Sequence, residues 1–85
     1  MPTISMFLGI IIQMNYNDHN PPHIHVSYQG KEATFSLDGE IIEGELPKKQ
    51  IKLVSAWCIL HEPELKANWE LSRQKEELFR IEPLK

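Results

Sequence analysis

The chain has 85 residues, and its nine basic and twelve acidic residues give a formal net charge of −3. This length fits a single domain over residues 1–85 and leaves no room for a second hydrophobic core. The mildly acidic balance argues against binding nucleic acid or a membrane surface through net charge alone, although a local basic patch stays possible.

Cysteine content and hydropathy narrow the class of protein further. Cys58 is the only cysteine, so an internal disulfide and a cysteine-based zinc site are both excluded. The longest apolar run, Met6–Ile12, is too short to span a bilayer and has no basic residue before it. We therefore expect a cytoplasmic protein without a membrane segment or signal peptide.

The first half of the chain shows the two-residue period of β-strands. Residues Thr3–Tyr16 are apolar on both faces near the middle, which predicts one central strand. After a loop at 17–22, further strands are expected at His23–Tyr28, Lys31–Leu37 and Glu40–Leu46. The Asp38-Gly39 pair favours a tight hairpin between the last two. These segments predict a four-stranded antiparallel meander.

The second half changes to a helical period. Pro47 suits the first position of a helix, because its missing N–H is not needed there. Apolar residues cover about half of the circumference of this predicted helix: Ile51, Leu53, Val54, Trp57, Cys58 and Leu60. Pro63 starts a second helix with a narrow apolar stripe, which we expect to lie across the surface or against a partner. The predicted fold is α+β, in the order ββββαα, with both helices on one face.

The segment Asp18–His25 holds three of the four histidines and is the strongest candidate site. Side chains two apart on a strand point the same way, so His23 and His25 should lie side by side. Two converging imidazoles are a sensible pair of metal ligands, and His19 or Asp18 could complete the site. Zinc, iron or nickel would suit these ligands better than calcium or magnesium.

The same residues permit two other interpretations. Without a metal, His23 and His25 could act as acid and base near neutral pH, with Asp18 as an auxiliary group, a chemistry used to cleave phosphodiesters. Alternatively, both histidines are outward-facing polar residues with structural roles. The spacing alone leaves the three possibilities open.

Other polar and aromatic residues have a structural and a functional interpretation. His61 could stabilise a helix C-terminus or contribute to a site. Lys48, Lys49 and Lys52 could pair with upstream acids or contact an anion. Trp57 and Trp69 are expected to pack in the core, and Gly44 is expected to mark a bulge or close backbone approach.

A family resemblance covers nearly the whole length. It rests on Pro2-Thr3-Ile4-Ser5, Phe7, Gly9-Ile10, Asp18-His19-Asn20-Pro21-Pro22-His23, His25, Tyr28, Gly44, Leu46-Pro47, Trp57, His61, Asn68-Trp69, Ile81 and Pro83-Leu84. In these the chain resembles a family of small bacterial proteins catalogued as a domain of unknown function. The resemblance implies a place in a two-gene, toxin–antitoxin-like module. The family tends to have basic residues, often arginine, where Lys48 and Lys49 stand.

Two functions are therefore expected as alternatives. The first is a toxin–antitoxin-like component that works through a small cognate protein, or as a homodimer. The second is a histidine-centred hydrolase or ribonuclease using His23 and His25, with RNA as a possible substrate.

Overall fold

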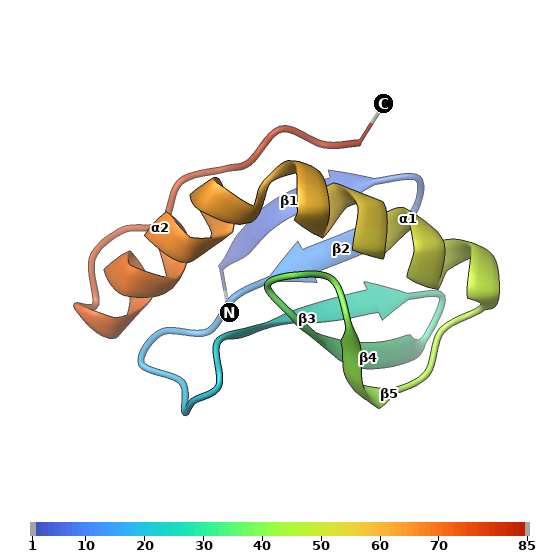
Figure 1. Ribbon diagram of the computed structural model, residues 1–85, viewed down its shortest axis with the longest axis horizontal. Coiled ribbons are helices and arrows are strands. Elements are labelled where there is room, and N and C mark those ends of the chain that lie inside the picture. The colour runs from blue at the N-terminus through green and yellow to red at the C-terminus, as the bar shows by residue number, and fades with distance from the viewer. Residues whose placement is uncertain (1, 85) are drawn as a thin grey trace.

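The computed structural model describes residues 2–84, which form one antiparallel sheet and two helices (Figure 1). The sheet has the order β1-β2-β3-β4-β5, and every neighbouring pair is antiparallel. Its strands are β1 (Thr3–Phe7), β2 (Ile10–Gln13), β3 (His23–Tyr28), β4 (Lys31–Ser36) and β5 (Ile41–Gly44). The helices are α1 (Lys48–Leu60) and α2 (Glu62–Arg73). The predicted α+β class, meander and helix pair are confirmed.

The sheet has five strands rather than four, because the segment expected as one strand, Thr3–Tyr16, folds back on itself. Phe7 pairs with Ile10, so Leu8 and Gly9 form a two-residue turn between β1 and β2. Both turn residues have positive φ, at 51° and 80°, as a tight hairpin turn of the mirror-image type requires. Leucine is unusual there, which is why the continuous apolar pattern concealed the turn.

One face of the sheet supplies the core, and both helices lie on that side (Figure 1). In β3, Ile24 and Val26 are buried towards the helices, whereas His25 and Ser27 alternate to the other face and are partly exposed. Trp57 from α1 and Trp69 from α2 are both buried, as expected. The opposite face carries no helix.

Gly44 ends β5, two residues after a bulge at Ile42 against β4. Its φ is +82°, and a β-carbon there would overlap the carbonyl oxygen of Glu32. The register between the two strands shifts at Thr34–Phe35. The expected close backbone approach at Gly44 is confirmed, and the bulge turns both Ile42 and Glu43 towards the hollow beside Thr34.

Helix α1 buries a narrower face than its sequence predicts. Val54, Trp57 and Cys58 are fully buried, but Leu60, expected on the apolar face, is 64 % exposed at the last residue of the helix. Among residues 2–84, no ion pair joins the lysines near its start to Glu43 or Glu45.

Helix α2 lies across the surface, one of the two expected arrangements, and packs its narrow stripe against its own chain. Its stripe residues Leu65, Trp69 and Ser72 are buried, and so is Asn68. The amide of Asn68 exchanges hydrogen bonds with the backbone of Phe79. These bonds direct the chain after α2 back along β1, where the N–H of Ile81 donates to the carbonyl of Ile4 (Figure 1).

None of the helices in the described part of the chain is long and apolar enough to cross a membrane.

Candidate functional site

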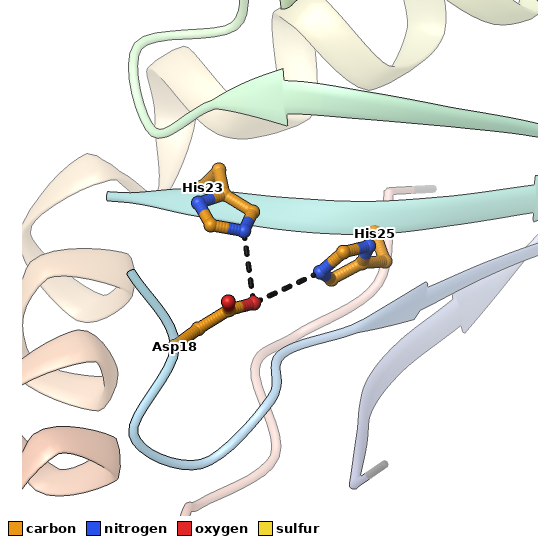
Figure 2. Close-up of side chains that lie close together, drawn as sticks. All are labelled: Asp18, His23 and His25. Carbon is orange, nitrogen blue, oxygen red and sulfur yellow. Dashed lines mark hydrogen bonds and ion pairs between the residues drawn. The ribbon is translucent and has the colours of Figure 1, made fainter. Parts of the chain in front are cut away.

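The loop between β2 and β3 and the start of β3 bring three predicted residues together. Asp18 lies at the middle of this loop, while His23 and His25 project from β3 with the spacing that the strand period predicts. Pro21 and Pro22 follow the turn and restrict its backbone, and the peptide bond between Asn20 and Pro21 is cis. The loop folds over the end of β3, so that the carboxylate meets both rings (Figure 2).

One carboxylate oxygen is the centre of the cluster. Asp18 Oδ2 lies 2.9 Å from His23 Nε2 and 3.2 Å from His25 Nε2 (Figure 2). One donor atom from each of these residues can be chosen so that all three lie within 4.8 Å of one another. An aspartate and two histidines at such separations form a candidate site for a metal ion.

The ring of His23 is held in place by several contacts. The residue is only 4 % exposed, and its Nδ1 lies 2.7 Å from the carbonyl oxygen of Pro21. Trp69 from α2 contacts the ring, with centroids 5.5 Å apart, and the ring of His25 meets it edge-on at 5.1 Å. Because a carbonyl oxygen can only accept, Nδ1 carries the proton and Nε2 is directed at Asp18.

The surroundings of Asp18 favour its ionised form. Partial burial alone raises the pKa of this carboxyl. Hydrogen bonds from His25 and the backbone N–H of His19 oppose that effect, aided by the charge of His23 and a hydrogen bond from Asn15. The result is a pKa well below its usual value, so the carboxylate is a permanent acceptor at neutral pH.

The cluster opens into a hollow on the helix-free side of the sheet. This hollow has a volume of about 130 Å³ and is lined by His19, Pro21, His23, His25, Thr34, Ile42 and Glu43. It gives a small ligand or water access to the ring of His25, whose side chain is 29 % exposed.

The remaining predicted histidines lie outside the cluster. His19 Nδ1 contacts the other carboxylate oxygen, Asp18 Oδ1, at 3.0 Å, and its side chain is 83 % exposed. His61 lies at the junction of the two helices, where its Nδ1 is 2.7 Å from Glu64 Oε1 and its ring packs against Trp57.

Asn15 and Glu43 belong to the site although the sequence did not single them out for it. Asn15 Nδ2 lies 3.3 Å from Asp18 Oδ2 and 3.2 Å from His25 Nε2, while its Oδ1 is buried without a hydrogen-bond partner among the described residues. The sequence did not indicate Asn15 as a site residue, because Asn15 lies within Thr3–Tyr16, the segment predicted as one strand. Glu43 lines the hollow because it is in register with Thr34, next to the bulge at Ile42, a pairing that the sequence pattern did not indicate.

Comparison with known proteins places the chain in a family without assigning a function. No curated protein and no solved structure was found to be similar to it. The sequence pattern of one family matches residues 9–70, a range that includes Asp18, His23 and His25 as well as both tryptophans. The chain therefore belongs to the family described as a domain of unknown function, DUF4160.

Proposed function

We propose that this domain is a metal-dependent hydrolase whose metal ligands are Asp18, His23 and His25. The observation that carries the proposal is the hydrogen bonding of His23. Its Nδ1 donates to Pro21, which leaves Nε2 2.9 Å from a carboxylate oxygen.

Two acceptor atoms do not remain at that distance without a cation between them. The carboxylate of Asp18 only accepts, and a neutral imidazole that donates through Nδ1 also only accepts through Nε2. Either a second proton or a metal ion must therefore lie between Nε2 and Oδ2. A ring N–H held by a backbone carbonyl is the usual second contact of a metal-binding histidine, because it fixes the tautomer and the ring orientation.

The separations between Asp18 and each histidine are close to those between two ligands of one metal ion. Two ligands held at about 2.0–2.1 Å by a tetrahedral ion are roughly 3.3 Å apart. The distances from Asp18 Oδ2 to the two Nε2 atoms, 2.9 and 3.2 Å, are close to this spacing. Imidazole and carboxylate ligands favour zinc, iron or nickel.

Three protein ligands leave a coordination position for water, which supports a hydrolytic rather than a purely structural centre. A divalent ion held this way would supply a Lewis acid that promotes ionisation of water near neutral pH. Glu43 lines the same hollow as His23 and His25, so a carboxylate is available to accept a proton from that water. We place this chemistry in the cytoplasm, in keeping with a single, unpaired cysteine.

Calorimetry with Zn²⁺ and Ni²⁺, supported by elemental analysis, tests the proposal. The native chain should bind one ion, and His23→Ala and Asp18→Asn should each lose about tenfold or more in affinity. His61→Ala is the matched control, since His61 also contacts a carboxylate but lies outside the cluster. Absent binding, or affinity unchanged by His23→Ala, would contradict the proposal and leave acid–base chemistry for these histidines.

A second candidate function, recognition of a cognate protein in a toxin–antitoxin-like module, is supported by strand β5. This edge strand is exposed throughout, with Ile41 38 % and Ile42 50 % exposed, and exposed edges pair readily with another chain. The other edge, β1, is accompanied by the segment around Ile81.

The cognate protein would be the product of an adjacent gene, and co-expression followed by size-exclusion chromatography tests for a complex. A complex that Ile42→Lys disrupts, while Ile59→Lys leaves it intact, would support β5 as the interface. Light scattering of the chain alone distinguishes a homodimer from a monomer. A monomer that forms no complex would remove this candidate.

A further inference from the structure

The helix-free face of the sheet carries a row of polar side chains that leads away from the proposed metal centre. Gln13 in β2 is in register with His25 in β3, His25 with Thr34 in β4, and Thr34 with Glu43 in β5. Because residues in register lie on the same side of a sheet, the metal ligand His25 is one member of a polar surface that crosses four strands.

A hollow of about 430 Å³ lies over this row. Such a volume is within the range of small-molecule and side-chain binding sites. Three of its lining residues, His25, Thr34 and Glu43, also line the smaller hollow that reaches His23. A group bound in the larger hollow would therefore lie directly beside the metal centre.

The charge of the larger hollow is negative. Glu32 and Glu43 both line it, and no lysine or arginine of residues 2–84 lines either hollow. Neither carboxylate takes part in an ion pair within residues 2–84. Lys31 precedes Glu32 in β4 but lines neither hollow, because successive side chains of a strand point to opposite faces. Lys48, Lys49 and Lys52 belong to α1, which lies on the other face of the sheet (Figure 1).

This arrangement distinguishes between substrate classes. Sites for phosphate esters and nucleic acids present arginine, lysine or a helix N-terminus to the phosphate oxygens. A surface with two unpaired carboxylates would repel such a substrate, and would attract an ammonium or guanidinium group. The hydroxyls of Ser27 and Thr34, also in the lining, offer neutral hydrogen-bonding groups that suit a peptide backbone.

We infer that the metal centre acts on a positively charged, lysine- or arginine-bearing peptide, held over the row by Glu32 and Glu43, and not on RNA. This inference rests on the proposed function, since it names the substrate class of the same site. It assigns Glu32 a role in substrate specificity that is separate from metal binding, because Glu32 lines only the larger hollow.

The test uses three probes and the zinc-loaded full chain: an unstructured lysine-rich peptide, the same peptide with glutamate at every lysine, and a single-stranded RNA. Fluorescence anisotropy should show that the lysine peptide binds about tenfold or more tightly than either of the others. Glu32→Lys should abolish this preference while zinc affinity stays unchanged. Glu76→Lys makes the same charge change at an exposed residue outside both hollows, and should preserve the preference.

The possible results distinguish a failure of this inference from a failure of the proposed metal site. If zinc binds but RNA or the acidic peptide is preferred, or if Glu32→Lys has no more effect than Glu76→Lys, the inference is overturned and the metal centre stands. If zinc does not bind to the native chain, both are overturned.

Discussion

His23 shows how a single side chain can be fixed before any ligand arrives. Its ring is buried, its Nδ1 donates to a backbone carbonyl, and Trp69 packs against one side. A ring held in one rotamer and one tautomer loses little conformational entropy when its second nitrogen binds an ion. The carbonyl of Pro21 and helix α2 therefore fix the position of the His23 ring.

Asp18 predicts a pH dependence of the apo-protein's stability. Because its folded pKa lies below the ordinary value of 3.8, ionised Asp18 contributes its full stabilisation above that pH; the contribution declines below 3.8 and is lost only as pH falls through the folded pKa. In the presence of a chelator, Asp18→Asn should cost about 1–3 kcal/mol of unfolding free energy at pH 7 and measurably less, but not zero, near pH 2.5.

Urea denaturation of native and Asp18→Asn chains at both pH values measures this difference. Glu76→Gln, at an exposed carboxylate, is the control and should change stability little at either pH. A loss in Asp18→Asn that is equal at pH 7 and pH 2.5 would show that its charge does not stabilise the fold.

Some residues of the candidate site could be predicted from the sequence. The two-residue spacing was enough to place His23 beside His25, because a strand fixes the direction of its side chains. It could not decide between Asp18 and His19 as their companion, since that depends on the path of the loop at 17–22. In the structure Asp18 enters the cluster, and His19 stays outside on the second carboxylate oxygen.

At the scale of elements, the end of β5 depends on a glycine more than its short length suggests. Gly44 and Gly30 have nearly the same positive φ, +82° and +80°, but only Gly44 approaches neighbouring backbone closely. Around Gly30 there is open space for a β-carbon. Adding a β-carbon at Gly30 would therefore cause only backbone strain, whereas adding one at Gly44 would cause backbone strain and steric overlap.

Gly30→Ala should destabilise the protein by about 1–2 kcal/mol, the cost of placing a β-carbon in the left-handed region. Gly44→Ala should cost clearly more, because β5 must also move away from Glu32. Thermal unfolding of the two variants provides the comparison. Equal losses would mean that β5 can shift freely, and Glu43 would then have no fixed position in the hollow.

The prediction of one strand over Thr3–Tyr16 failed because a continuous apolar pattern gave no sign of the turn within it. β3 was predicted with its observed bounds, because both of its ends are marked by turn residues. The hairpin at Leu8-Gly9 has only one such residue, and leucine takes the other position despite its positive φ. The burial of Phe7 and Ile10 on either side of the turn supports that conformation through tertiary packing, which a local pattern cannot reveal.

On the scale of the whole molecule, the two faces of the sheet have different roles. One face is covered by α1 and α2 (Figure 1) and holds the core. The other carries the polar row and both hollows around His25. The site lies at the end of β3, where the loop from β2 and helix α2 meet the sheet. A chain of this size can thereby keep a packed core and still leave one sheet face open for a ligand.

The most direct measurement is the anomalous scattering of zinc in crystals grown with Zn²⁺. We expect one strong peak about 2.0–2.2 Å from a carboxylate oxygen of Asp18, His23 Nε2 and His25 Nε2, with Nδ1 of His23 still bonded to Pro21. A structure without a peak at these three atoms, or with zinc bound only at another position such as His61 and Glu64, would contradict it.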